Sequence, residues 1–130
     1  MELLTVTLST AAAAAILNVW LMLRVGAVRQ AEKISVGDED NENLIRRMRA
    51  QANCAEYAPF GLLLLLMLEM QGGNVVFVHA MGLCLLLGRA AHAYGFASKP
   101  MNLPMRQLGM VLTFIQLIAT SIALLLAALL

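Results

Sequence analysis

Charged residues are scarce in this sequence of 130 residues, at 13% of the chain, about half the share found in soluble domains. With a net charge of +1 and few aromatic residues, the chain lacks the basic, aromatic-rich surface of a nucleic-acid-binding protein. Cysteine is scarce as well. Cys54 and Cys84 lie in apolar runs without metal-ligand spacing. This pattern predicts two small buried side chains and neither a disulfide framework nor a metal site.

Hydrophobic residues are abundant instead, at 61% of the chain against about 45–50% in soluble domains. A soluble domain of this length cannot bury so much apolar surface, so the composition predicts an integral membrane protein. A spanning helix needs about 20 mainly apolar residues. The chain has four such segments, at residues 3–23, 44–70, 75–96 and 105–130. We therefore expect one all-α domain over residues 1–130, a membrane-embedded four-helix bundle.

The basic residues predict the orientation of these spans. All nine lysines and arginines flank the first and third connections, whereas the second connection and both chain ends have none. The positive-inside rule assigns the basic side to the cytoplasm, which places both termini on the non-cytoplasmic side. The first span lacks a basic leader and a cleavage site, so we expect it to be retained. Arg24 and Arg29, at its end, are best placed to contact lipid phosphates.

Acidic residues mark the two ends of the second span. Residues 38–40 and Glu42 precede it, but Asn43 and Arg49 stand where a calcium-binding loop needs glycine and glutamate. The run instead predicts a helix N-terminus at which Asp and Asn side chains cap free backbone amides. At the opposite end of this span, we expect Glu69 to reach the outer headgroups.

The second span opens with a polar face that a helix exposed to lipid would lack. At about 100° per residue, helical spacing gathers five side chains on one arc: Arg46, Arg49, Asn53, Glu56 and Tyr57. A glutamate at that depth must pair with another group or face a wet cavity. Two interpretations follow. The side chains tie neighbouring helices together, or they form a cytoplasm-facing pocket in which arginines bind the carboxylates of a small anionic ligand.

Further basic residues occur in the third and fourth spans. Arg89, His92 and Phe96 share one face of the third helix, whereas Tyr94 lies about 140° from Arg89. Arg106 stands at the start of the fourth helix, where the helix dipole disfavours a cation. This placement indicates an anion nearby, with a lipid phosphate as the equal alternative. The additional cations favour the ligand pocket over purely structural pairing.

The run from Arg49 to Pro59 resembles the RAxxNxxEYxP signature of the MAPEG superfamily, the membrane-associated proteins in eicosanoid and glutathione metabolism. The HAYG stretch at residues 92–95 is similar to one found in small bacterial inner-membrane members related to YecN. The resemblance extends over nearly the whole chain. It implies a four-helix bundle that assembles as a homotrimer in the inner membrane and binds glutathione, its co-substrate, between subunits near the cytoplasmic face, without a metal.

The resemblance also implies roles for individual residues. The glutathione-binding set would comprise Arg46, Arg49, Asn53, Glu56, Tyr57, Arg89, His92 and Tyr94. Glu56 would bind the ammonium group and the cations the carboxylates. Residues 103–106 resemble the xPxR segment of prostaglandin E synthase-like members, whose arginine lies close to the glutathione sulfur. Arg106 would therefore be the catalytic residue.

The expected chemistry is thiol activation. A free thiol with a pKa of about 8.5 is mostly protonated at pH 7, whereas the thiolate is the nucleophile. Lowering that pKa by about two units takes roughly 2.7 kcal/mol, which one guanidinium in a partly dry pocket can supply. We therefore expect a membrane-bound glutathione transferase or peroxidase acting on small apolar electrophiles. The family's tyrosine seven residues after Arg89 falls at Phe96, which has no hydroxyl, so a non-catalytic binding or scaffold protein of the same fold is the alternative.

Overall fold

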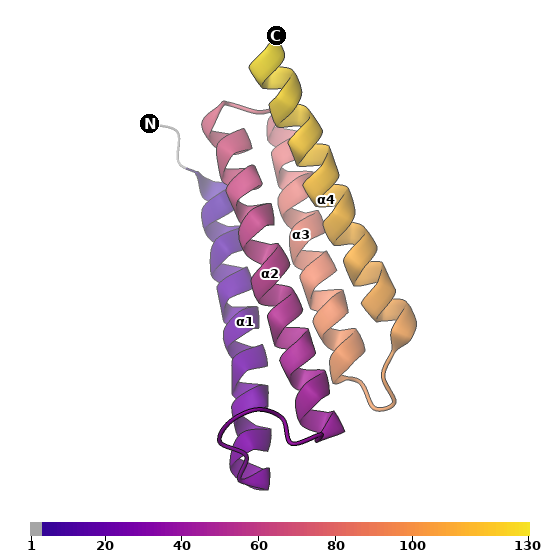
Figure 1. Ribbon diagram of the computed structural model, residues 1–130. Helices are drawn as coiled ribbons and strands as arrows, with labels where there is room; N and C mark the ends of the chain where they lie inside the picture. Colours follow the sequence, from indigo (N-terminus) through magenta and orange to yellow (C-terminus); the bar gives the residue numbers. More distant parts are fainter. Residues whose placement is uncertain (1–3) are drawn as a thin grey trace.

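The computed structural model describes residues 4–130 as four long helices joined by short loops (Figure 1). The helices are α1 (Thr5–Glu32), α2 (Glu42–Met70), α3 (Val75–Ala97) and α4 (Leu103–Leu129). Each is long and apolar enough to cross a membrane, which confirms the all-α prediction. Each contains one predicted span, apart from the end residues Leu4 and Leu130 and from Leu3, which lies outside the described residues.

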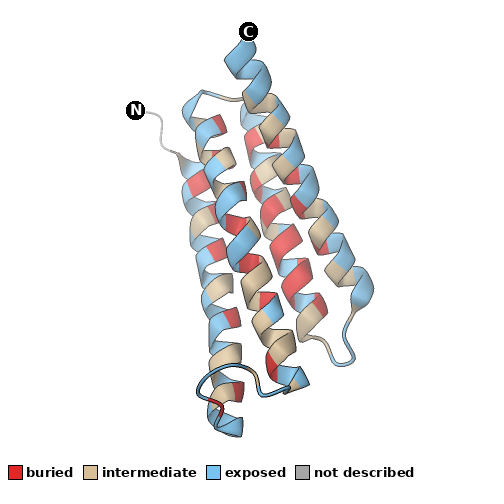
Figure 2. Cartoon of the chain, in the orientation of Figure 1, coloured by how far each residue is buried: buried red, intermediate tan, exposed pale blue. Residues whose placement is uncertain are grey.

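The helices run side by side, with α2 in contact with all three others (Figure 1). α3 packs most extensively against α4, whereas α1 contacts α2 and α3 and, within the described residues, does not reach α4. Buried residues line the inner faces of the bundle, and the outer faces are exposed (Figure 2). Many exposed side chains there are large and apolar, such as Ile16, Leu63 and Ile118. Such an apolar exterior is typical of helices that face lipid.

Glycine permits the close approach of α3 to α4. A Cβ atom at Gly109 would lie 2.5 Å from the backbone oxygen of Gly88 and 2.5 Å from the backbone nitrogen of His92. A Cβ atom at Gly95 would lie 2.5 Å from the backbone nitrogen of Arg106. No side chain tolerates such contacts, so the two backbones touch only because these positions lack one. The pairing brings the end of α3 against the start of α4.

Asparagine side chains cap three of the four helices. Asn41, Asn74 and Asn102 each accept a hydrogen bond from the backbone N–H three residues further on, at 3.0 to 3.1 Å. Each side chain thereby satisfies one of the N–H groups that a helix start leaves free. The predicted N-terminus of the second helix is confirmed here, with Asn41 as its cap.

The start of α1 is capped from another helix. Leu4 provides no side-chain cap, and the two carboxylate oxygens of Glu69 in α2 accept hydrogen bonds from the backbone N–H groups of Val6 (3.0 Å) and Thr7 (2.8 Å). The free amides and the dipole of a helix start both favour a carboxylate. The prediction that Glu69 only reaches the headgroups is therefore wrong. Sixty-two residues separate Thr7 from Glu69, so local sequence gave no sign of this contact.

α1 also extends beyond its predicted apolar span. Residues 24–32, expected to belong to a polar connection, continue the helix to Glu32. They are rich in alanine, arginine and glutamine or glutamate, which favour helix. Hydropathy detects where the apolar segment ends and not where the helix ends, which explains the difference.

The two cysteines are packing residues. Both are free thiols, with Cys54 buried and Cys84 half-buried. The Cys84 thiol donates a hydrogen bond to the backbone oxygen of Leu112 at 3.1 Å. The prediction of small, largely buried side chains is confirmed for Cys54 and holds in part for Cys84.

Candidate functional site

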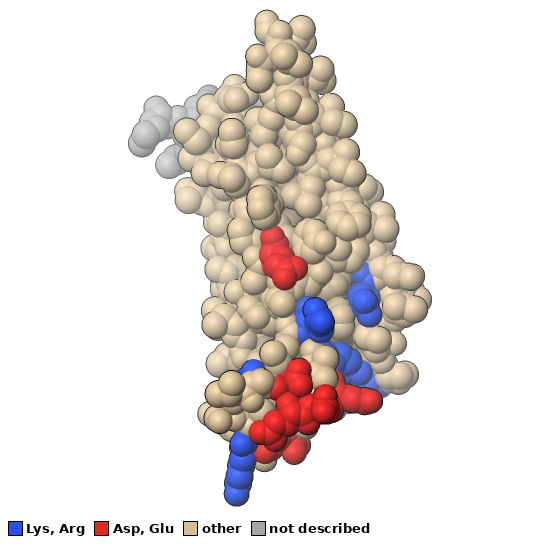
Figure 3. Space-filling model, viewed as in Figure 1, with Lys and Arg blue, Asp and Glu red and all other residues tan. Residues whose placement is uncertain are grey.

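Charged side chains gather at one end of the bundle. On the face shown in Figure 3 they occupy the lower part, and the upper part is uncharged. This end unites the C-terminal ends of α1 and α3 with the N-terminal ends of α2 and α4. The start of α1 and the end of α4 lie at the opposite end (Figure 1).

A cavity of about 580 Å³ lies between α2, α3 and α4 at the charged end. This volume is within the range of roughly 300–1,000 Å³ that is usual for small-molecule sites. Six predicted site residues line it: Arg46, Arg49, Asn53, Glu56, His92 and Arg106. The other lining residues are Glu42, Ile45, Ala52, Phe96 and Met110. We call this space the site cavity.

Arg49 and Glu56 are exposed members of the cavity wall. They project from the same face of α2, two helical turns apart. Within residues 4–130, no side chain or backbone group donates a hydrogen bond to Glu56, and no carboxylate pairs with Arg49. The ion pairs that would tie helices of one chain together are thus not formed by these two residues. Both charges are available to a ligand or to a second copy of the chain.

Arg106 is held by an aromatic side chain of α3. Its guanidinium carbon lies 4.5 Å from the centre of the Phe96 ring, and that ring lies 5.0 Å from the His92 imidazole. A cation above an aromatic face is attracted by the ring quadrupole. Phe96 therefore faces the site cavity, as its helical position predicted, and supports Arg106 without offering a hydroxyl donor.

Arg89 lies beneath the cavity and is only 1% exposed. Its Nε and Nη2 donate to Thr113 Oγ1 at 3.0 and 2.8 Å, and its Nη1 donates to Asn53 Oδ1 at 2.6 Å. The guanidinium carbon lies 5.6 Å from the centre of the Tyr57 ring. Among the described residues no carboxylate pairs with Arg89, so neutral oxygens and an aromatic face compensate its charge. A buried cation with this kind of compensation favours an anion nearby.

The hydrogen bond from Arg89 orients Asn53. The side-chain oxygen of Asn53 is occupied by Arg89, so its NH₂ group is the part left for the cavity. Asn53 can therefore donate to an anionic ligand, and Arg89 acts on the cavity through it. The cavity lining holds three arginines, Arg46, Arg49 and Arg106, and two glutamates, Glu42 and Glu56, and Arg89 binds the lining residue Asn53 from behind.

Besides Arg89, two predicted residues lie outside the cavity wall. The Tyr57 ring packs edge-on against Phe114, with 5.9 Å between ring centres. The same ring lies under the Arg89 guanidinium. Tyr94 is 57% exposed and does not line the cavity, as its angle from Arg89 indicated. A direct contact of either tyrosine with glutathione stays a prediction.

A buried polar stripe on α4 was not predicted from the sequence. Four of its residues are buried: Gly109, Thr113, Gln116 and Thr120. Thr113 accepts from Arg89, and Gln116 Nε2 donates to the backbone oxygen of Gly61 in α2 at 3.1 Å. These residues recur every three to four positions along an otherwise apolar helix. Such periodic small and polar residues are typical of helix contacts in membranes and could have identified the stripe.

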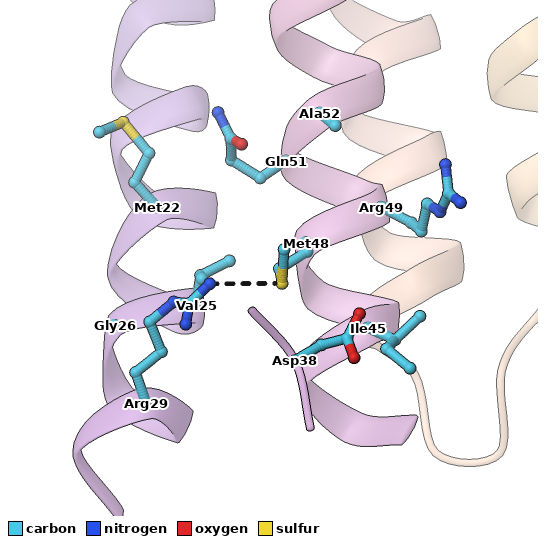
Figure 4. Close-up of a pocket in the computed structure, with 10 residues that line it drawn as sticks. All are labelled: Met22, Val25, Gly26, Arg29, Asp38, Ile45, Met48, Arg49, Gln51 and Ala52. Atoms are coloured by element: carbon cyan, nitrogen blue, oxygen red, sulfur yellow. Dashed lines mark hydrogen bonds between the residues drawn. The ribbon is translucent and has the colours of Figure 1, made fainter. Parts of the chain in front are cut away.

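A second cavity, of about 600 Å³, lies between α1 and α2 at the same end (Figure 4). Arg29 projects from α1 into this region, where it donates to the backbone oxygen of Gly37 (2.9 Å) and approaches Met48 Sδ (3.6 Å). Arg29 thus contacts both the loop that follows α1 and the helix α2, and its expected contact with a lipid phosphate stays a prediction. Arg49 borders both cavities, and its guanidinium points away from α1 (Figure 4).

Known proteins share this sequence pattern. The sequence model of the MAPEG family matches residues 7–126. Two relatives from Escherichia coli, strains K12 and O6:H1, both named Inner membrane protein YecN, are each 34% identical to the chain over 86 residues. The matched region covers 63% of this chain and 66% of each relative, just under two thirds of their length. Because the family match extends from the start of α1 into the last turn of α4, the chain belongs to the MAPEG family of membrane proteins.

Proposed function

We propose that this chain binds glutathione in the site cavity and activates its thiol for attack on small apolar electrophiles. The charge distribution of the cavity is the observation that supports this most. Three arginines and two glutamates line a space of about 580 Å³, and a fourth arginine, Arg89, is hydrogen-bonded to the lining residue Asn53. Glutathione carries two carboxylates, one ammonium group and a thiol, so its charges complement those of the cavity. The family's link to glutathione metabolism points to the same ligand.

Each wall residue has a chemical role in this proposal. Glu56 binds the ammonium group, and Arg46 and Arg49 bind the carboxylates, for which the planar guanidinium fork is suited. Asn53 donates to a further ligand oxygen. Arg89 is a positioning residue, because its contact with the site runs through the Asn53 amide.

Arg106 supplies the thiolate stabilisation. It lies at the α4 side of the cavity, held against Phe96. A guanidinium close to the sulfur stabilises its anionic form in a partly dry pocket. The thiolate then attacks an electrophilic atom of an apolar molecule that reaches the cavity through the bilayer. A carbon–sulfur bond forms as the bond from that carbon to its leaving group breaks, the leaving group departs with the bonding electron pair, and the thiol proton is released to solvent.

Phe96 favours a second candidate function. It occupies the position facing Arg106 where related enzymes place a tyrosine, and it has no hydroxyl to donate to the sulfur. A protein of this architecture that binds glutathione or a lipid-like ligand without turning it over fits that feature. The two functions differ in one measurable property, the ionisation of the bound thiol.

We further propose that the chain assembles as a homotrimer in a bacterial inner membrane, with the charged end in the cytoplasm. Glu56 is exposed on α2 and lies near exposed Phe60 (67%) and Leu63 (53%). A charge facing lipid costs several kcal/mol, whereas a neighbouring subunit would cover this face and complete the cavity. The molar mass of the protein in detergent, measured by light scattering, tests the trimer. A reporter that is active only in the cytoplasm, fused after Leu130, tests the orientation. It should be inactive, because the proposed orientation places the end of α4 on the non-cytoplasmic side.

Equilibrium binding to the detergent-purified chain tests the function. Calorimetry measures glutathione affinity, and ultraviolet absorbance measures thiolate in the bound state. Arg106→Ala should bind glutathione but lose the thiolate signal. Lys99→Ala is the matched control, because it removes an exposed positive charge near α4 that does not line the cavity.

The outcomes separate the two functions. A thiolate signal that depends on Arg106 supports the enzyme and justifies a screen of electrophiles. Binding without thiolate supports the non-catalytic protein. If millimolar glutathione does not bind, the glutathione proposal is wrong, and the fold and family stand.

A further inference from the structure

A group of arginines, one of them shared with the site cavity, borders a narrow hollow between α1, α2 and α3 at the charged end. Arg24, Arg46 and Arg47 all line it. Arg47 Nη1 donates to the backbone oxygen of Arg24 at 2.8 Å, which joins α2 to α1. Arg46 and Arg47 lie close enough to Arg24 for their charges to act on it. We call Arg24, Arg46 and Arg47 the arginine cluster.

The charge of this cluster is not neutralised by the chain. Arg46 donates to the backbone oxygen of Ser98 (3.0 Å), and Arg47 donates to the side-chain oxygen of Asn43 (3.3 Å). Within the described part of the chain, none of the three arginines pairs with a carboxylate. The nearby acidic residue Asp38 lines the cavity between α1 and α2, and Glu42 lines the site cavity together with Arg46 without pairing with it. Three like charges in close range attract an anion.

A tryptophan marks the depth of the cluster. The Arg24 guanidinium carbon lies 4.8 Å from the centre of the Trp20 ring, and Trp20 is 41% exposed. Next to it, Val19 (53%) and Leu23 (67%) also face outward. Tryptophan is enriched where the acyl chains of a bilayer meet the headgroups. The cluster therefore combines uncompensated cations with an apolar surface at headgroup level.

We infer that the arginine cluster binds the phosphate of an anionic phospholipid of the surrounding leaflet. Arg24 and Arg47 present guanidinium groups from two adjacent helices, and such groups bind phosphate oxygens through paired hydrogen bonds. Trp20 holds Arg24 in place and lies against the upper part of the acyl chains. Arg24 and Arg47, which make the phosphate contacts, lie on the α1 side of the bundle, and neither of them lines the site cavity.

Trp20 provides a direct reporter, because it is the only tryptophan of the chain. The full chain is reconstituted in phosphatidylcholine vesicles that contain an equal mole fraction of brominated phosphatidylglycerol or brominated phosphatidylcholine. Bromine quenches tryptophan fluorescence on contact. We expect the anionic lipid to quench Trp20 at least twofold more strongly than the neutral one. The ratio of the two values is the readout, so changes in total fluorescence do not matter.

Charge-matched variants identify the residues responsible. Arg24→Gln with Arg47→Gln should reduce the ratio to about one. Arg47→Gln alone leaves the Arg24–Trp20 contact in place and should lower the ratio in part. Lys33→Gln with Lys99→Gln removes the same total charge from exposed positions and should keep the ratio of the unchanged chain.

Three results would overturn the inference. One is equal quenching by the two lipids in the unchanged chain. Another is an equal loss in both double variants, which would indicate general attraction of the charged end to an anionic membrane. The third is relief of the quenching by millimolar glycerol phosphate, which would show that the cluster prefers a soluble phosphate to a lipid.

Discussion

Two glutamates of the same helix show how differently this bundle uses one side chain. Glu69, near the end of α2 remote from the charged end, accepts two backbone hydrogen bonds from the start of α1. Glu56, closer to the charged end, lines the site cavity and receives no hydrogen bond from residues 4–130. A carboxylate whose acceptor capacity is satisfied within the chain has a structural role. One that is left unsatisfied at a depth where charge is costly requires a partner from outside.

The same contrast applies to the arginines. Arg89 donates to two other helices and is buried, whereas Arg49 is exposed between two cavities. Composition and spacing make these residues look equivalent. Their hydrogen bonds divide them into those that hold the bundle together and those available for binding.

Replacement of Glu56 should have the largest effect on binding. Glu56→Gln keeps the shape and removes the charge that pairs with the ligand ammonium, so glutathione affinity should fall on the order of 100-fold, about 2.7 kcal/mol. The free energy of unfolding should change by less than about 0.5 kcal/mol. Calorimetry and denaturation in mixed micelles measure the two quantities. Undiminished affinity would assign Glu56 to a subunit interface and not to the ligand.

Asn53 combines both roles and should affect both measurements. Asn53→Ala leaves Arg89 without one buried acceptor, which should lower the free energy of unfolding by about 2 kcal/mol. It also removes a donor from the cavity, so affinity should fall about tenfold. Thr113→Val is the matched control, because it removes the hydroxyl acceptor of Arg89 and keeps Asn53. A loss of affinity in this control as large as in Asn53→Ala would contradict a direct role for Asn53.

Replacement of Glu69 should affect stability alone. Glu69→Ala removes both acceptors at the start of α1, which should cost about 1.5 kcal/mol of unfolding free energy. Glu69→Gln keeps one acceptor oxygen and should cost about half as much. Glutathione affinity should stay within twofold in both variants. An Ala variant as stable as the parent chain would show that the cap contributes nothing in the membrane.

Tyr94→Phe should have the smallest effect. The side chain is exposed and lies outside the cavity wall, so loss of its hydroxyl should change neither unfolding nor affinity beyond about twofold. Calorimetry measures the affinity, and denaturation in mixed micelles measures the free energy of unfolding. A fivefold loss of affinity would indicate that Tyr94 contacts glutathione bound in the cavity of a neighbouring subunit.

Local patterns predicted much of this molecule. Four apolar segments of spanning length identified the helices, and the helical period of α2 identified the face with Arg49, Asn53 and Glu56. The departure at Phe96 was also visible, because its angle relative to Arg89 follows from spacing alone. Each of these properties depends on residues within a few turns of one another.

Properties that depend on the pairing of helices could not be predicted in this way. The cap from Glu69 to Thr7, the contact of Arg89 with Thr113 and the turn of Arg29 toward Gly37 each depend on how close two elements come. In the case of α3 and α4, glycines determine that distance. One sequence shows the glycines but not which helix they meet.

The cap on α1 has a consequence for how the protein is made. A ribosome completes α1 long before it reaches Glu69. The backbone amides of Val6 and Thr7 therefore lack their acceptor until α2 has been synthesised. In lipid, unsatisfied amides are unfavourable. We therefore expect α1 to stay beside the translocon until α2 is complete, and the two helices to enter the bilayer together as a hairpin.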